Sequence, residues 1–246
     1  VLAGNVKKAF NKKFYNPETR SYGDFGSNIF ALVLGVPDDR YDDVVATLKH
    51  EISVKYDNHL NTGIFGTQFF FETLALNGLN DIAYNAMNQE DFPSFGNWIK
   101  QGATVTWEKW NGADSRNHPM FGGGLTWFYR ILAGVNVDAE RPAYEHIIIK
   151  PILDKRLPEV YYSHMTPYGE VVSEIRQTGR NLEMNVTVPV GSTATIYIPV
   201  GGNTSEVTES GISVRDSKDV RFERIQDGNC IVRVPQGKYK FKVDNQ

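Results

Sequence analysis

The chain has 246 residues, of which 41% are hydrophobic and 22% charged, enough for one or two domains with proper cores. Its net charge of −3 argues against a nucleic-acid surface or an anionic membrane surface as its main role. The apolar runs are a few residues long, far short of the roughly 20 residues that span a bilayer. Cys230 is the single cysteine, which excludes an internal disulfide and a cysteine-based metal site.

The sequence contains no GxxxxGK[ST] phosphate loop, no HExxH zinc helix and no GxSxG nucleophile elbow. We therefore expect no cofactor and no metal. The chain opens at Val1 directly on an amphipathic segment, without the pattern of a signal peptide. We interpret it as a processed or excised piece of a longer protein.

The first part of the sequence has helical periodicity. Apolar residues four apart, beginning at Leu2 and ending at Phe14, predict a helix with one apolar face that Asn16-Pro17 ends. Further helices are predicted over residues 26–36, 38–52, 67–76, 80–87 and 127–132. These patterns give about six helices with short links, apart from one longer loop region over 94–119.

Capping residues predict where several of these helices begin and end. Asp38, Thr67 and Asn80 are expected N-caps, because their side-chain oxygens can accept from free backbone N–H groups. Asn77-Gly78 is expected to end one helix, since glycine tolerates the left-handed conformation found there.

Near residue 138 the spacing of apolar residues changes from the helical pattern to alternation, in which every second residue is apolar. Alternating runs begin at Leu182 and at Ala194, with Gly191-Ser192 as the turn between them. Asp227-Gly228 and Gln236-Gly237 read as hairpin-like turns. About eight short strands predict an antiparallel β-sandwich. The predicted domains are therefore a helical domain over 1–138 and a β-sandwich domain over 139–246.

The helical residues leave two architectures open. Six helices in antiparallel pairs suit either a bundle or half of a toroid of twelve helices. The helix over 26–36 is apolar on nearly all sides, which suits an inner ring covered by other helices.

The segment over 101–124, QGATVTWEKWNGADSRNHPMFGGG, carries the chemistry. Glu108 stands between Trp107 and Trp110. Indole faces stack on the C–H faces of sugars, and a carboxylate accepts from hydroxyls or activates water. His118 can add a hydrogen-bonding group to the same pocket. The alternative is that both indoles belong to the core and Glu108 is a solvated charge at a helix end.

This segment resembles the bacterial α-L-rhamnosidases of glycoside hydrolase family 78. The family pattern GATxxWExW, followed by NHxxFG, is matched by residues 102–110 and 117–122. Other blocks match in order: HLNTGIFGT at 59–67, QEDFPS at 89–94, YRILAG at 129–134, IIIKP at 147–151 and PYG at 167–169. The resemblance therefore covers nearly the whole chain.

The resemblance implies an α+β multidomain fold, in which 1–138 is the C-terminal half of an (α/α)6 barrel and 139–246 an antiparallel β-sandwich. It implies hydrolysis of terminal α-L-rhamnosides with inversion, with Glu108 as the general base. In that mechanism a second carboxylic acid, roughly 6.5–9.5 Å away, protonates the glycosidic oxygen. The family's acidic block that holds this acid has no match here, so we expect this chain alone to be inactive.

The resemblance also implies the residues that contact substrate. His118 matches a histidine that contacts rhamnose, and the indoles shape the pocket wall. The substrate-binding candidates are His118, Trp107, Trp110, Thr62, Gly63, Thr67 and Asn117.

The expected partners are a rhamnose-containing oligosaccharide or glycoside and the missing N-terminal part of the same protein, with no nucleic acid and no membrane. Two alternatives remain open: another (α/α)6 carbohydrate-active enzyme acting on a different sugar, and a non-catalytic carbohydrate-binding or structural module. The compartment is not defined by the sequence, although periplasmic or extracellular export is favoured for a bacterial parent enzyme.

Overall fold

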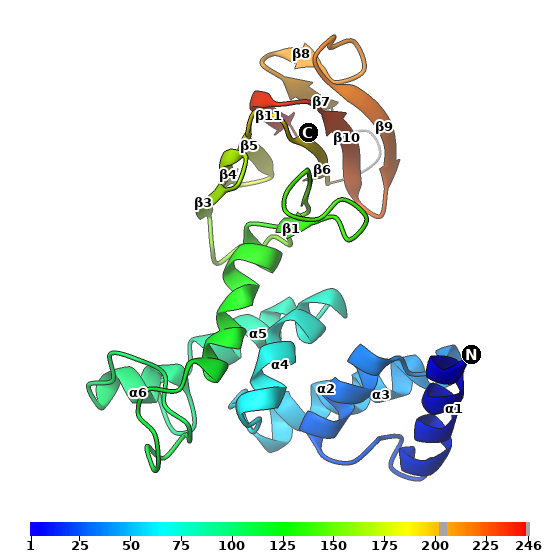
Figure 1. Ribbon diagram of the computed structural model, residues 1–246, viewed down its shortest axis with the longest axis vertical. Coiled ribbons are helices and arrows are strands. Elements are labelled where there is room, and N and C mark those ends of the chain that lie inside the picture. Colours follow the sequence, from blue (N-terminus) through cyan, green and yellow to red (C-terminus); the bar gives the residue numbers. More distant parts are fainter. Residues whose placement is uncertain (202–205, 245–246) are drawn as a thin grey trace. The chain divides into compact units, whose positions relative to one another are not determined.

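The computed structural model describes residues 1–201 and 206–244. Contacts divide the chain into two compact units, Val1–Thr126 and Trp127–Gln246. The first unit is helical, and the second consists mainly of strands (Figure 1). Helices followed by sheets confirm the predicted fold class.

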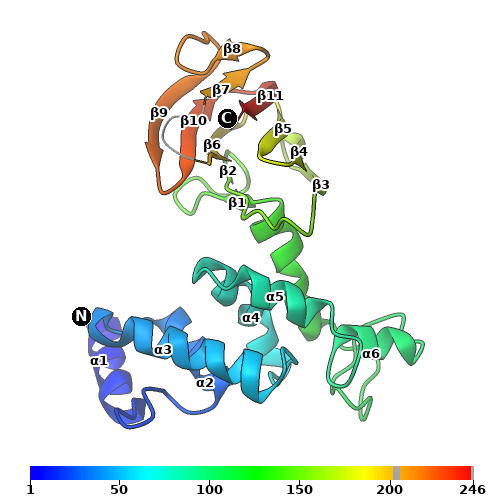
Figure 2. The same ribbon diagram turned by 180° about the vertical axis from the view of Figure 1, so that it is seen from behind.

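The helical unit contains α1 (Leu2–Phe14), α2 (Phe25–Leu34), α3 (Asp38–His50), α4 (Ile64–Leu76), α5 (Asn80–Met87) and α6 (Phe95–Lys100). A π-helical turn, η1 (Glu51–Lys55), follows α3, and a 3-10 segment, η2 (Pro119–Leu125), ends the unit. Helix α2 lies beside α3 and α4, and α4 also contacts α5 and η2 (Figures 1 and 2).

Helix α2 forms where the sequence predicts a buried helix. Asp24 caps its start, because Oδ1 accepts from the backbone N–H of Ser27 at 3.1 Å. Gly35, at φ 105°, ends it before Pro37. Its buried residues pack into an aromatic core in which the Phe25 and Phe70 ring centroids are 5.9 Å apart.

The three predicted N-caps are wrong. Asp38 and Asn80 are the first residues inside α3 and α5, whose N-cap positions are occupied by Pro37 and Leu79. Helix α4 begins at Ile64, three residues before Thr67, whose Oγ1 donates to the carbonyl of Gly63 at 2.9 Å. The predicted exit at Asn77-Gly78 is confirmed, since Gly78 has φ 73°.

Helix α1 confirms the first predicted helix, but most of its apolar face is exposed. Leu2, Val6 and Phe14 are more than half exposed, whereas the ring of Phe10 stacks on Tyr22 with centroids 5.5 Å apart. The region over 94–119 also differs from the expected loop, because α6 lies within it.

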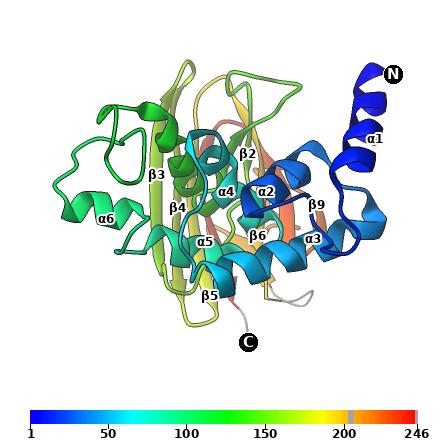
Figure 3. The same ribbon diagram turned by 90° about the horizontal axis from the view of Figure 1, so that it is seen from below.

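The second unit opens with a π-helical segment, η3 (Trp127–Leu132). Its described strands are β1 (Val135–Val137), β2 (His146–Ile149), β3 (Glu159–Thr166), β4 (Gly169–Thr178), β5 (Asn181–Val188), β6 (Thr193–Pro199), β7 (Glu206–Glu209), β8 (Ile212–Ser213), β9 (Arg221–Gln226), β10 (Asn229–Val234) and β11 (Gly237–Asp244). One sheet has the order β1-β2-β6-β10-β9 and the other β3-β4-β5-β11-β7-β8. Figure 3 shows β3, β4 and β5 as neighbours in the second sheet.

Alternating residues of both sheets form one core, as the period of two predicts. In β5 the core residues are Leu182, Met184, Val186 and Val188. Strand pairing is antiparallel in the described residues except between β2 and β6, which run parallel.

The predicted turns had different outcomes. Asp227-Gly228 joins β9 and β10 as a hairpin, and both residues have positive φ, as a tight hairpin turn requires. The hairpin at Gln236-Gly237 is wrong, because β10 and β11 belong to different sheets. None of the described helices is long and apolar enough to cross a membrane.

Candidate active site

The loop between α6 and η2 folds back on itself and presents Glu108. The backbone N–H of His118 donates to the carbonyl of Thr106 at 2.8 Å, and Thr106 Oγ1 donates to the carbonyl of His118 at 2.7 Å. Further along, the N–H of Glu108 donates to the carbonyl of Ser115 at 2.8 Å. These bonds pair the two arms of the loop and bring Glu108 next to His118.

The Glu108 carboxylate is held at one oxygen and open at the other. Oε2 accepts from the backbone N–H of Ser115 at 3.1 Å and lies 3.9 Å from His118 Nδ1. Oε1 has no hydrogen-bond partner among the described residues, and 35% of the side chain is exposed. A carboxylate fixed at one oxygen and accessible at the other can accept a proton from water or a hydroxyl.

The neighbouring cation, Lys109, forms an ion pair with Asp114 rather than with Glu108. Its Nζ lies 2.6 Å from Asp114 Oδ2, and this hydrogen bond raises the pKa of Lys109. Lys109 therefore stays protonated without being paired to Glu108.

An aromatic cluster of Trp98, Trp107, Phe121 and Trp110 supports the loop. The Trp110 ring lies 4.5 Å from both the Trp98 and the Phe121 ring centroids. Trp98 Nε1 donates to the carbonyl of Trp110 at 2.8 Å. Trp107 is only 3% exposed, and the Arg116 guanidinium covers its ring at 4.7 Å. The two indoles beside Glu108 are therefore not equivalent, because Trp107 is a core residue and Trp110 is only partly buried.

A pocket of about 300 Å³ opens beside this cluster. Its lining residues are Gly63, Phe92, Glu108, Lys109, Trp110, Asn111 and Phe121. Aromatic walls with one carboxylate match the usual make-up of a small-molecule site, in which apolar surface binds and a few polar groups orient. No group of three or more His, Cys, Asp or Glu side chains suited to a metal ion occurs within the described ranges.

The structure brings three of the candidate residues together at this pocket: Glu108, Trp110 and Gly63. His118 adjoins Glu108 but does not line the pocket, and its Nε2 is buried without a hydrogen-bond partner among the described residues. Asn117 is exposed, and its N–H donates to Ser115 Oγ at 3.2 Å.

Thr62 and Thr67 are buried and do not line the pocket. Thr67 Oγ1 donates to Gly63, so Thr62 Oγ1 must be the donor in its 2.8 Å hydrogen bond with Thr67 Oγ1. The Thr62 carbonyl accepts from Trp110 Nε1 at 2.8 Å. These two threonines therefore connect the start of α4 to the loop of Glu108.

Trp98 and four lining residues, Phe92, Lys109, Asn111 and Phe121, were not among the sequence candidates. Trp98 stands on α6, a helix of six residues that is too short to show periodicity. The available signal was Ser94, whose Oγ accepts from the N–H of Asn97 at 2.9 Å and marks a helix start.

The chain therefore combines a helical unit, which carries a carboxylate in an aromatic pocket, with a unit of packed β-sheets. Residues 1–132 match the bacterial alpha-L-rhamnosidase 6 hairpin glycosidase domain, and residues 134–213 match the bacterial alpha-L-rhamnosidase C-terminal domain. The chain belongs to the bacterial alpha-L-rhamnosidase family.

Curated relatives carry the same family name. An alpha-L-rhamnosidase of Formosa agariphila is 27% identical over 96% of this chain, and one of Streptomyces avermitilis is 27% identical over 98%. The matched regions are 26% and 24% of the two relatives, so the chain spans about a quarter of their length.

Solved structures are similar over nearly the whole chain. The alpha-L-rhamnosidase of Dictyoglumus thermophilum has a TM-score of 0.87 and 33% identity, with 99% of this chain and 28% of that chain covered. The Streptomyces avermitilis alpha-L-rhamnosidase complexed with L-rhamnose has a TM-score of 0.84 and 25% identity, with 98% and 24% covered.

Proposed function

We propose that this chain is part of a glycoside hydrolase that cleaves terminal α-L-rhamnosides with inversion, and that Glu108 is its general base. The observation that carries the proposal is the Glu108 carboxylate at the edge of an aromatic pocket, fixed through Oε2 and open at Oε1. Family membership supports the hydrolase class, and a relative that binds L-rhamnose supports the sugar.

In this proposal Glu108 Oε1 accepts a proton from a water molecule as that water attacks the anomeric carbon. The C–H faces and the C5 methyl group of rhamnose pack against Trp110 and the exposed Phe92, which line the pocket. The glycosidic oxygen leaves from the opposite face of the sugar and takes a proton from a separate acid.

That acid lies outside this chain in our account. Among the lining residues, all of which the structure describes, Glu108 carries the only carboxylate. An inverting enzyme needs a second carboxyl group roughly 6.5–9.5 Å from the first to leave room for water. We assign this acid to the N-terminal part of the same protein. The curated relatives are about four times as long as the region that this chain matches, which supports the assignment. The chain alone is then inactive.

We further assign residues 1–138 to the C-terminal half of an (α/α)6 barrel and residues 139–246 to the β-sandwich. The apolar face of α1, exposed at Leu2, Val6 and Phe14, supports a covering by the other half. His118, Asn117 and Gly63 are assigned to sugar binding. We assign a supporting role under the loop of Glu108 to three side chains that are buried: Trp107, Thr62 and Thr67.

The test is nitrophenol release from a nitrophenyl α-L-rhamnoside by the 246-residue chain and by a chain extended upstream in its gene. Activity only in the extended chain, with β-L-rhamnose as the first product anomer, is the expected result. Activity in the short chain would contradict the external acid, and a first product with the α configuration would contradict inversion. If both chains fold but are inactive, the proposal is wrong, and the protein is either an enzyme for a different sugar or a non-catalytic module.

A further inference from the structure

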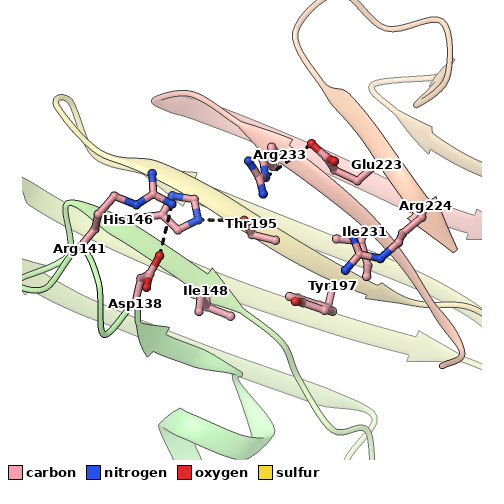
Figure 4. Close-up of a pocket in the computed structure, with 10 residues that line it drawn as sticks. All are labelled: Asp138, Arg141, His146, Ile148, Thr195, Tyr197, Glu223, Arg224, Ile231 and Arg233. Atoms are coloured by element: carbon pink, nitrogen blue, oxygen red, sulfur yellow. Dashed lines mark hydrogen bonds and ion pairs between the residues drawn. The ribbon is translucent and has the colours of Figure 1, made fainter. Parts of the chain in front are cut away.

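A second pocket, of about 140 Å³, lies within the C-terminal unit (Figure 4). It stands on the face of the β1-β2-β6-β10-β9 sheet that points away from the sandwich core. The residues of these strands that alternate with the pocket residues, such as Ile147, Ile196 and Val232, belong to the core. No residue of the proposed catalytic pocket lines it.

Strand register explains why the pocket residues gather. Ile148 pairs with Thr195 and Thr195 with Arg233, so these three stand in one row across β2, β6 and β10. The adjoining row across β6, β10 and β9 consists of Tyr197, Ile231 and Arg224. Paired residues project to the same side of a sheet, so both rows face the pocket.

An irregularity in β9 adds a further charged residue. The register with β10 shifts between Ile231 and Val232, whose partners are Arg224 and Phe222, so Glu223 is the extra residue of a bulge. Consecutive strand residues normally face opposite sides, but a bulge changes the direction of a side chain. Glu223 and Arg224 therefore both line the pocket.

The pocket is rich in guanidinium groups with free donors. Arg141 Nη2 lies 3.3 Å from Asp138 Oδ2, and Arg233 Nε lies 3.5 Å from Glu223 Oε1. Arg224 Nε donates to the side chain of Gln226 and, within the described ranges, pairs with no carboxylate. A guanidinium has five N–H donors, and such exposed pairs are weak, so much of this donor capacity is available to a ligand.

His146 fixes one wall without adding charge. It is buried, and its two ring nitrogens hydrogen-bond with Thr193 Oγ1 at 2.7 Å and Thr195 Oγ1 at 2.8 Å. Burial lowers the pKa of His146, and the nearby Arg141 charge lowers it further. The positive charge of the pocket is therefore carried by its arginines.

The floor between these charges is apolar. Ile231 on β10 faces outward yet is only 3% exposed, whereas Tyr197 on β6 and Ile148 on β2 are partly buried. At the rim, Lys150 Nζ lies 5.0 Å from the Tyr197 ring centroid and adds another cation. The volume is well below the roughly 300–1,000 Å³ of pockets for drug-sized ligands and suits a single sugar ring.

We propose that this pocket binds a sugar acid, a uronate unit, on the sandwich. Its carboxylate pairs with Arg224 and Arg233, which stand on the adjacent strands β9 and β10, because guanidinium groups match planar carboxylates in shape and charge. Arg141, at the opposite side of the pocket, donates to a hydroxyl group of the sugar. Its C–H face packs on Ile148 and Tyr197, which line the pocket and are partly buried. Its hydroxyl groups donate to acceptors of the lining residues, among them the Asp138 and Glu223 carboxylates. Those carboxylates would repel a bare inorganic anion, whereas they suit an anion that carries hydroxyl donors.

The proposal does not depend on the catalysis assigned to Glu108. The test is isothermal titration calorimetry of D-glucuronate into the full-length protein that contains this chain. Arg224→Gln removes a guanidinium without leaving a carboxylate unpaired, and Arg141→Gln is a second variant at the opposite side of the pocket. Arg176→Gln is the matched control, since Arg176 pairs with Glu174 and Glu159 on the other sheet.

Glucuronate is expected to bind, with Kd raised about tenfold or more by each pocket variant and unchanged by Arg176→Gln. D-glucose, which lacks the carboxylate, is expected to show no heat at the same concentrations. Binding unaffected by both pocket variants, or the absence of glucuronate binding, would overturn the proposal. Sulfate that bound as tightly as glucuronate would also overturn it, because it would reduce the pocket to a general anion site.

Discussion

The indole Nε1 of Trp110 donates a hydrogen bond of 2.8 Å to the carbonyl oxygen of Thr62, 48 residues earlier in the chain. This bond joins the loop of Glu108 to the segment that begins α4. Thr62 in turn hydrogen-bonds with Thr67 inside α4. The position of the carboxylate is therefore fixed by a helix of the unit as well as by its own loop.

Replacing Trp110 by Phe should lower the free energy of unfolding by roughly 1–3 kcal/mol, because the Thr62 carbonyl loses its donor in a largely buried place. Urea unfolding of the full-length protein, followed by far-UV circular dichroism, measures the change. Tyr161→Phe serves as a control, since Tyr161 is 68% exposed. Equal stability of Trp110→Phe and wild type would show that this bond does not hold the loop.

His118 should act mainly in binding. Its Nε2 is buried without a partner among the described residues, and its Nδ1 is 3.9 Å from Glu108, beyond hydrogen-bond distance. We predict that His118→Ala raises KM for a nitrophenyl rhamnoside about tenfold and changes kcat less. The exposed His50 on α3, replaced by Ala, is the control. A lowered kcat at unchanged KM would instead assign His118 to the chemical step.

Self-association should follow from the exposed apolar residues of α1 and α2. Leu2, Val6, Phe14 and Leu34 are each more than half exposed, and exposed apolar surface of this kind favours association. Sedimentation of the 246-residue chain should therefore show dimers or aggregates, and the upstream segment should restore a single species. Monomers of the short chain at high concentration would argue against a missing half-barrel.

Cys230 should be unreactive in the native chain. Burial raises the pKa of its thiol to about 11, so at about pH 8 only about one thiol in a thousand is ionised. Dithiobis(nitrobenzoate) should label the folded 246-residue chain very slowly and the urea-unfolded chain quickly. Rapid labelling of the folded chain would mean that the strand β10 opens readily.

Periodicity predicted the parts of the fold that repeat over many residues. The apolar run before Pro37 gave α2, and the alternation from Leu182 gave β5. Periodicity did not indicate α6, because a helix of six residues is too short to show a repeat. The turn residues Gln236-Gly237 predicted a hairpin, although the chain changes sheets there. Turn residues favour a local bend, but long-range pairing decides which strands become neighbours.

For the site, the sequence indicated the loop that carries Glu108, but it did not indicate which side chains of this loop are buried. Trp107 and Trp110 look equivalent on either side of Glu108, yet only the folded loop shows that Trp107 is buried under Arg116. Trp98 comes from another element, and local spacing carries no information about that contact.

The most direct test of the account is the kcat of Glu108→Gln in the full-length protein, with Glu90→Gln as the matched control. Glu90 is exposed and pairs with Lys100 at 2.8 Å, outside the pocket. We predict that Glu108→Gln lowers kcat for a nitrophenyl α-L-rhamnoside by about 10²–10⁴-fold with unchanged thermal unfolding, since a general base contributes about that much. A Glu108→Gln enzyme with near wild-type kcat would contradict the account.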